Sequence, residues 1–354
     1  MKQGMNIQEL AQEIARIDST KRDFVVPTDK LWAEVDEEEE KPEIRIRVHV
    51  NGGVESFGIN QVGHGQIANK LEIPKKYYDR MEKDAPDLLA TNINCWMRQE
   101  PKRRLVRTLD GDVRAFLSDR FGLYLDNALL LTSAMPTLMK YQDMQFKSLM
   151  ITDKRLYLQC VYPKIQGKLK VGDMVQAGLV LSNSEVGCGQ FMCERLIFIL
   201  SCLNGAIRGK SLSRRHVSRI LGDDPDDFYK EDTIKSEIDT FKLMVRDTVE
   251  NAFDKTEFLK DVEKIDEISG RHIEGKIDKT VEEISKATGI YETEKEEVLK
   301  RLINGGDLSQ WGVSQSITKL AHDVETYDRS VELQRIGGDV IDMPEDQWRA
   351  YSSN

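Results

Sequence analysis

The stretch from Glu43 to Gly53 decides the fold of the centre of the chain: Glu-Ile-Arg-Ile-Arg-Val-His-Val-Asn-Gly-Gly. Every second side chain from Ile44 to Val50 is apolar, and the side chains between them are basic. This alternation predicts a β-strand with one buried face and one basic, solvent-facing face. The Asn51-Gly52-Gly53 sequence favours a tight turn, so we expect an antiparallel hairpin here.

Similar patterns extend outward from this hairpin. Strand-like segments are expected at 106–117, around the turn Leu109–Asp112, and at 156–161 and 174–181. Helical segments are expected at 66–71, at 74–81 and at 127–138, the last interrupted by Pro136. Because strands and helices do not alternate regularly, the sequence predicts an α+β fold with a mostly antiparallel sheet core and helices, and not a doubly wound sheet.

The two ends of the chain have a different pattern. A helical spacing over residues 7–17 is followed by an acidic linker at 37–42, and helical stripes recur after residue 221. We therefore predict an N-terminal helical segment with an acidic linker (1–40), a basic α+β core (41–220) and an acidic helical C-terminal domain (221–354). Two apolar stripes of this last part are expected to support self-assembly into a homo-oligomer: Ile234-Ile238-Phe241-Val245 and Val313-Ile317-Leu320-Val324.

Charge is distributed very unevenly along the sequence. The whole chain has a net charge of -10. Residues 1–40 hold 5 Lys and Arg against 11 Asp and Glu, residues 41–220 hold 28 against 17, and residues 221–354 hold 18 against 33. A basic centre neutralises phosphates, so a polyanion is the expected partner, and the acidic ends compete with it or contact a neighbouring subunit.

The composition limits the classes of protein to consider. No apolar stretch is long enough to span a membrane, and the polar N-terminus predicts no signal peptide. The five cysteines are an odd number without an export signal, so we expect reduced thiols in a cytoplasmic protein that has no membrane partner.

Basic residues near aromatic ones are the strongest functional signal, because cations neutralise phosphates and aromatic rings stack on unpaired bases. Each cluster alone also fits a solvated face or a docking surface for the acidic tail. The candidate nucleic-acid-binding residues are Arg98, Lys102, Arg103, Arg104, Arg107, Arg114, Arg120, Lys164, Lys168, Lys170, Arg208, Lys210, Arg214, Arg215 and Arg219.

Two other kinds of site, a phosphate-binding loop and a zinc site, do not fit the sequence. Gly209-Lys210-Ser211 follows an apolar run, as in a phosphate-binding loop, but Asn204 stands where that motif needs its first glycine. Cys188, Cys193, Cys202 and His216 do not have the spacing of zinc ligands. The sequence therefore predicts no catalytic residues, no metal and no cofactor.

Several motifs together resemble a family of phage- and plasmid-borne proteins called domain of unknown function 932, over about residues 20 to 340. The matching pieces are Ile73–Tyr78, Val113–Arg120, Gly172-Asp173 with Gln176–Gly178, Ser182–Gly187, Cys202–Gly205, Ile317–Asp323 and Tyr327–Arg329. The resemblance implies a mobile-element protein and supplies no catalytic residues. A basic core with an acidic helical tail is also similar in architecture to single-strand annealing proteins of the RecT and Redβ type.

These observations lead to one functional expectation and two alternatives. We expect a non-catalytic protein that binds single-stranded DNA or RNA in recombination, repair or replication. The first alternative is a mobile-element protein that engages a host defence or replication factor. The second is a nucleotide-dependent enzyme that uses Lys210.

Overall fold

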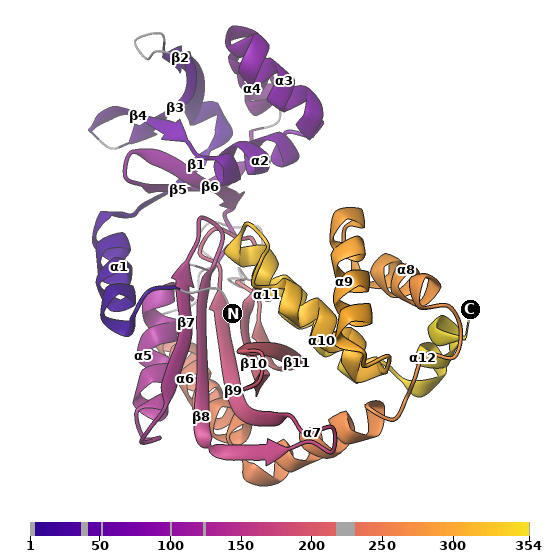
Figure 1. Ribbon diagram of the computed structural model, residues 1–354. Helices are drawn as coiled ribbons and strands as arrows, with labels where there is room; N and C mark the ends of the chain where they lie inside the picture. The colour runs from indigo at the N-terminus through magenta and orange to yellow at the C-terminus, as the bar shows by residue number, and fades with distance from the viewer. Residues whose placement is uncertain are drawn as a thin grey trace.

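The structure, a computed structural model, describes residues 4–36, 42–50, 52–99, 101–122, 125–216 and 231–353. Figure 1 shows two units, each built on its own sheet: a smaller one, drawn in indigo and purple, and a larger one that carries the C-terminal helices. The predicted α+β class is confirmed, because almost all strand pairs in both sheets are antiparallel. The one parallel pair joins β4 to β6 over two residue pairs.

The smaller unit is a six-stranded sheet with helices on one face. Its strand order is β1-β5-β6-β4-β3-β2, and one core cluster lies between sheet and helices. The expected hairpin is β3–β4, and Ile44, Ile46 and Val48 are buried as the alternation predicts. The elements are β1 (Arg22–Pro27), η1 (Thr28–Lys30), β2 (Leu31–Asp36), β3 (Glu43–Val50), β4 (Gly53–Ile59), α2 (Gln61–Lys70), α3 (Lys75–Asp84), α4 (Pro86–Gln99), β5 (Arg103–Leu109) and β6 (Asp112–Ser118).

The larger unit is a five-stranded antiparallel meander covered on both faces. Its order is β11-β10-β9-β8-β7. Because both faces are buried, strand β10 is apolar on both sides, which explains the dense apolar run before residue 203. The elements are β7 (Gln145–Ile151), β8 (Leu156–Lys168), β9 (Met174–Asn183), β10 (Phe191–Ile199) and β11 (Asn204–Arg214).

Helices from both ends of the chain cover this meander (Figure 1). One face packs against α1, α5, α6 and α7, and the other packs against α11. Gly338 lets α11 approach closely, since a Cβ there would lie 1.8 Å from the carbonyl oxygen of Ile207 in β11. The helices are α1 (Ile7–Thr20), α5 (Asn127–Leu138), α6 (Glu231–Ala252), α7 (Lys255–Ile268), α8 (Ile277–Thr288), α9 (Glu292–Gly305), α10 (Gln310–Leu320), α11 (Tyr327–Asp342) and α12 (Glu345–Ser352).

Local sequence accounts for where several helices begin and end. Helix α1 starts with a capping box, because the side chain of Asn6 accepts from the backbone of Glu9 at 2.9 Å and Glu9 accepts from the Asn6 backbone at 2.8 Å. The interruption expected at Pro136 is wrong: α5 continues to Leu138. Proline removes one backbone hydrogen bond, and so close to the helix end little structure depends on it.

The predicted boundaries at residues 40 and 220 lie outside the described residues and stay predictions. Strands β1 and β2 belong to the six-stranded sheet, and α1 packs on the other unit. The described stripe residues are already covered within the chain: Phe241 and Val245 are buried against the meander, and Val313, Ile317 and Leu320 lie in the core of α8–α12. The side chain of Ile234 is outside the described part. Ile238 and Val324 are only half-buried, and the homo-oligomer stays a prediction.

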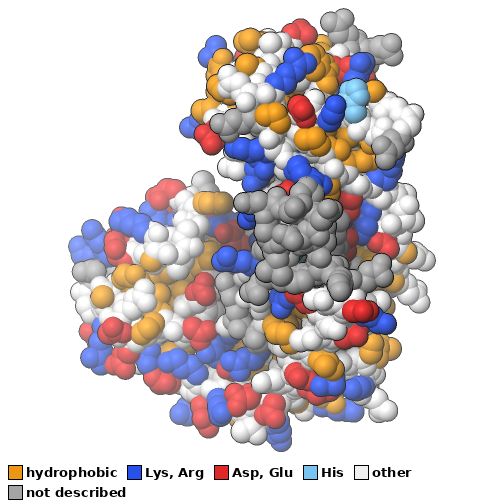
Figure 2. All heavy atoms as spheres, turned by 180° about the vertical axis from the view of Figure 1, so that it is seen from behind, with side chains coloured by type: hydrophobic (Ala, Val, Ile, Leu, Met, Phe, Trp, Pro, Cys, Tyr) orange, Lys and Arg blue, Asp and Glu red, His pale blue; other side chains and the backbone are white. Residues whose placement is uncertain are grey.

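Charges that are segregated along the sequence are mixed in space. Seen from behind, the helical C-terminal part shows lysines and arginines interspersed with acidic residues (Figure 2). Many are neighbours on one helix, such as Lys286 with Glu282 and Lys300 with Glu297. Within the described residues, no helix combines the length and apolar character needed to cross a membrane.

Candidate functional site

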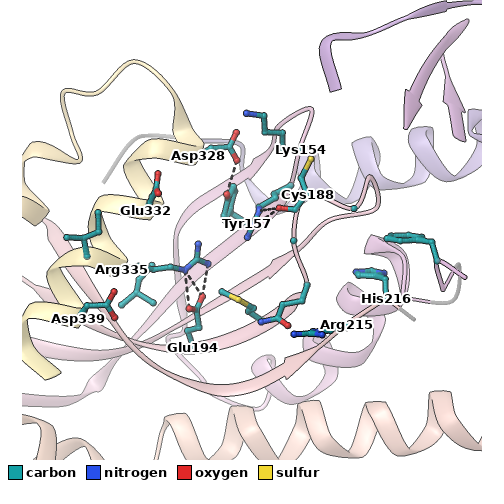
Figure 3. A pocket seen from close by; sticks show the side chains of 18 of the residues that line it. Lys154, Tyr157, Cys188, Glu194, Arg215, His216, Asp328, Glu332, Arg335 and Asp339 are labelled. Atoms are coloured by element: carbon teal, nitrogen blue, oxygen red, sulfur yellow. Dashed lines mark hydrogen bonds and ion pairs between the residues drawn. The ribbon is translucent and has the colours of Figure 1, made fainter. Parts of the chain in front are cut away.

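A cleft of about 1270 Å³ lies where the two units and α11 meet. It exceeds the usual 300–1,000 Å³ or so of a small-molecule pocket. The six-stranded unit and the residues after it contribute Lys70, residues 117–118 and 120–121, and α11 contributes residues such as Asp328 and Arg335. Between them lie the β10–β11 side of the meander and the glycine-containing loop after β9. Figure 3 shows α11 on one side of the cleft and Arg215 with His216 on the other.

The carboxylates on the α11 side already have partners inside the protein. Glu194 accepts from Arg335 at 2.7 Å, and Asp328 accepts from the hydroxyl of Tyr157 at 2.8 Å (Figure 3). Glu332 pairs with Arg329 at 2.6 Å, and Asp342 pairs with Arg208. Burial and the Asp328 carboxylate together raise the pKa of Tyr157, which keeps this hydroxyl a donor. Each of these four carboxylates thus has a partner within the fold, but Asp328 is held by hydroxyl groups, and Arg329 and Arg208 are shared with Glu294 and Asp261.

The opposite side of the cleft is cationic. Lys70, Arg120 and Arg215 are exposed there, and Lys154 is exposed in the turn between β7 and β8, beside Asp328 (Figure 3). Among the described residues no ion pair joins these four side chains to a carboxylate. A fifth cation, Arg155, donates two hydrogen bonds to the Cys188 carbonyl, at 3.1 and 2.6 Å, and so stays uncompensated as well. Several positive charges that face one cleft without an ion-pair partner of their own favour an anionic ligand.

An aromatic stack stands beside these cations. The rings of Phe121 and His216 lie 4.7 Å apart and are nearly parallel, at 2°. His216 also contacts Asn183, with 2.8 Å between Nε2 and Oδ1. Burial lowers the pKa of His216, so the stacked ring is neutral at neutral pH. Phe121 is only half-buried and lines the cleft, which gives it ring surface for a planar ligand.

The chemistry of the cleft does not point to a nucleophile. Cys188 lines it, but burial raises the pKa of this thiol, and the nearby Lys154 and Arg155 oppose that rise only in part. The reactive form of cysteine is the thiolate, so Cys188 is protonated and weakly reactive at neutral pH. Binding is therefore better supported than covalent catalysis.

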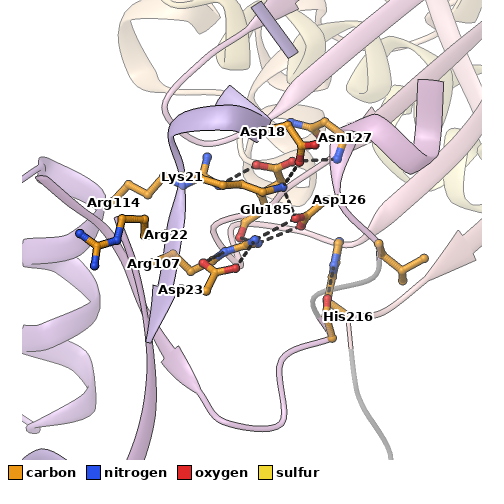
Figure 4. Close-up of polar contacts among 12 residues, drawn as sticks. Asp18, Lys21, Arg22, Asp23, Arg107, Arg114, Asp126, Asn127, Glu185 and His216 are labelled. Atoms are coloured by element: carbon orange, nitrogen blue, oxygen red, sulfur yellow. Dashed lines mark hydrogen bonds and ion pairs between the residues drawn. The ribbon is translucent and has the colours of Figure 1, made fainter. Parts of the chain in front are cut away.

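Next to the cleft, a buried ion-pair network joins the two units; we call it the junction (Figure 4). Arg107 is completely buried and uses all five N–H groups. It binds Asp23 at 2.8 and 3.0 Å, Asp126 at 2.9 Å through two bonds, and the Glu185 carbonyl at 2.9 Å. Arg107 comes from β5, whereas Asp126 and Glu185 belong to the larger unit.

Two further ion pairs complete the junction. Arg114 donates to Glu185 at 2.7 Å, and the other oxygen of Glu185 accepts from the backbone of Asn127 at 2.8 Å, at the start of α5. Lys21 reaches Asp126 at 2.5 Å. Burial alone raises the pKa of Asp126, but the hydrogen bonds and charges of Arg107 and Lys21 outweigh it and lower this pKa.

The structure distributes the predicted basic residues over several places. Arg120 and Arg215 lie in the cleft. Arg107 and Arg114 are buried in the junction, and Arg208 is buried against Asp261 and Asp342, so these three leave the candidate set. Their charges are already neutralised by carboxylates inside the fold. Arg214 pairs with Glu237. The side chain of Lys210 and the whole of Arg219 lie outside the described part.

The other candidates form two groups away from the cleft. Arg98, Lys102, Arg103 and Arg104 lie around the end of α4 and the start of β5. Lys164, Lys168 and Lys170 lie at the far end of β8, which is about 40 Å long at roughly 3.3 Å per residue. Lys164 there pairs with Asp143 at 2.9 Å. The single basic groove implied by the sequence is therefore not formed.

The near-match to a phosphate-binding loop is explained by a hairpin. Asn204 begins β11 and Gly209-Lys210-Ser211 lies within that strand, paired with β10. A phosphate-binding loop needs a loop that leads into a helix, so the nucleotide-enzyme alternative loses its structural basis. No group of three or more His, Cys, Asp or Glu side chains is placed to hold a metal in the part of the chain that is described.

Three cleft residues were missed in the sequence. Lys70, Lys154 and Arg155 are single or paired cations in otherwise mixed surroundings, without a neighbouring cluster. Lys154 and Arg155 stand in the short turn between β7 and β8, where exposed basic residues are common, and only the packing of the units brings that turn to the cleft. The two glycines beside Cys188 were a sequence signal for a turn at the cleft. In the structure Gly187 has a φ of +71°, which glycine adopts without strain.

Comparison with known protein families, with curated proteins and with solved structures found no match. The resemblance to the phage and plasmid family thus stays a prediction. Its motifs nevertheless gain a physical role: Ser182–Gly187 and Val113–Arg120 meet at the junction and the cleft.

Proposed function

We propose that this protein binds single-stranded nucleic acid along the cationic side of the cleft, without catalysing a reaction. The observation that carries the proposal is the asymmetry of charge compensation. The carboxylates of the α11 side are largely satisfied internally, whereas Lys70, Arg120, Lys154 and Arg215 face the cleft without a described acidic partner. Phosphates supply the missing negative charge.

Phe121 supports a preference for unpaired bases. Its ring is held parallel to His216 between Arg120 and the loop after β9, and it lines the cleft. In a duplex the faces of the bases are covered by their neighbours, whereas a single strand offers them for stacking on aromatic rings. A cationic wall with an exposed ring therefore suits a single strand of DNA or RNA.

The test compares single-stranded and duplex oligonucleotides of one sequence. A labelled strand of about 20 nucleotides is titrated with the protein at low and high salt, with anisotropy as the readout. We expect tighter binding of the single strand than of the duplex and a steep loss of affinity as salt rises. Equal affinity at both salt concentrations, or no binding at low salt, contradicts the proposal and favours a partner that is a protein.

A further inference from the structure

A second aromatic and cationic surface lies on the smaller unit, on the face of β2–β3–β4 that the helices leave open. Trp32, Arg47 and Ser56 form one cross-strand row of this face, and Arg47 is ion-paired there with Glu34 at 2.6 Å. Side chains alternate between the two faces of a strand. In these strands one set is buried against α2–α4, so the other set points to the open face. Trp32 is 37% exposed and lines a hollow of about 580 Å³ together with Arg47, His49, Val54 and Ser56.

Helix α4 places a second cation on the indole. The guanidinium of Arg98 lies 4.2 Å from the centroid of the Trp32 ring. The helix is fixed to strand β2 by Asn94, whose side chain bonds the backbone N–H and carbonyl of Ala33, both at 2.7 Å. Trp32 and Arg98 are therefore held together before any ligand arrives, which lowers the entropic cost of stacking a third planar group.

More positive charge stands at the same corner of the unit. Thr28, at the start of the 3-10 turn that leads into β2, exchanges hydrogen bonds with Lys102 at 3.0 and 3.1 Å, and Arg103 is opposite Pro27 in the β1–β5 register. The start of β5 thus lies beside the turn that leads into β2. An indole edged by cations matches the ring of a base attached to a phosphate backbone.

The other three tryptophans differ from Trp32 in their exposed fraction or in their contacts with cations. Trp311 and Trp348 are 1% and 2% exposed and lie in the hydrophobic cores. Trp96 is 46% exposed on α4, but among the described residues no cation lies over its ring. Trp96 is therefore a matched control: it has the same side chain in the same unit, with similar exposure and without the cation pair.

We propose that Trp32, with Arg98 over its ring, is a stacking site for an unpaired nucleic-acid base, separate from the cleft. The proposal takes its ligand class from the proposed function, but it concerns a different surface. A strand that occupies both surfaces contacts both units, which fixes their relative position beyond what the junction provides.

The test uses intrinsic tryptophan fluorescence during titration with an unlabelled oligothymidylate of about eight nucleotides. The variants are Trp32→Phe and Trp96→Phe, with the cleft variant Arg120→Ala/Arg215→Ala in parallel. We expect Trp96→Phe to keep the quenching seen in the wild type and Trp32→Phe to lose most of it. Trp32→Leu is expected to weaken binding about tenfold in a label-based assay, with the urea midpoint as the check on folding.

The cleft variant separates this proposal from the proposed function. Quenching that depends on Trp32 and persists in Arg120→Ala/Arg215→Ala supports the stacking site even if the cleft plays no part. Salt-sensitive binding that requires the cleft, with equal quenching in Trp32→Phe and the wild type, overturns the stacking site alone. Quenching that disappears in Trp96→Phe also overturns it.

Discussion

Two arginines only six residues apart, Arg114 and Arg120, have opposite roles in the junction and in the cleft. Arg107 and Arg114 are buried and bound to Asp23, Asp126 and Glu185, whereas Arg120 is exposed in the cleft with no described carboxylate partner. In the junction the protein supplies the anions itself, and the charge holds two units together. In the cleft the anion is missing, and the charge is available to a ligand. A count of basic residues cannot separate these two uses, but their local partners can.

The largest effect is expected from breaking the junction. Arg107→Met removes a completely buried guanidinium and leaves the part-buried Asp126 with Lys21 alone, and the loss of such a buried ion pair costs about 3–5 kcal/mol in the free energy of unfolding. The free energy of unfolding is measured by urea titration. Arg103→Met is the matched control, because Arg103 is exposed in the same strand, and its effect is expected within about 0.5 kcal/mol. Equal stability of the two variants would falsify the structural role of Arg107.

A smaller effect is expected from the aromatic ring in the cleft. Phe121→Leu keeps an apolar side chain beside His216 but removes the stacking surface, so single-strand affinity is expected to fall by about 1 kcal/mol or more. The control is Phe146→Leu, a half-buried phenylalanine of β7 outside the cleft, which is expected to leave the affinity unchanged. An affinity loss of the same size in both variants argues against a stack at Phe121.

The smallest effect is a pH dependence at the junction. The folded-state pKa of Asp126 is lowered, so this carboxylate contributes its full stability above its unfolded pKa of about 3.9. As the pH falls below that value, the unfolded chain binds the proton before the folded protein does. The contribution of Asp126 to stability therefore decreases steadily, and it is gone once the pH lies below the folded-state pKa. The stability difference between the wild type and Asp126→Asn is therefore expected to be constant near neutral pH and to shrink in acid. A difference that grows in acid contradicts the assignment.

Local patterns predicted much of the fold, because a strand period or a turn sequence acts over neighbouring residues. The β3–β4 and β5–β6 hairpins and the helical C-terminal region are examples. The hairpin β10–β11 was missed, since burial on both faces removes the alternation. The apolar run before Gly209 therefore resembled the strand that precedes a phosphate loop.

The candidate site was predicted less well, because it depends on contacts between distant segments. The partners of Arg107 stand 84, 19 and 78 residues away, and no local pattern joins them. One signal was present: Arg114 lies in a strand between the apolar residues Val113 and Ala115, where a charge is buried and needs a partner. The charge segregation of the sequence gave no such help, since the acidic helices fold back on the basic sheet.

The salt dependence of oligonucleotide binding tests most directly whether the unpaired cations of the cleft bind the strand. The wild type is compared with Arg120→Ala/Arg215→Ala and with Lys168→Ala/Lys170→Ala, which removes two exposed charges at the far end of β8. For a single strand each phosphate contact contributes about 0.7 to the slope of log affinity against log salt. We predict that the cleft variant loses about 1.4 of this slope and that the far-end variant keeps it. An unchanged slope in the cleft variant, or an equal loss in both variants, would contradict the account.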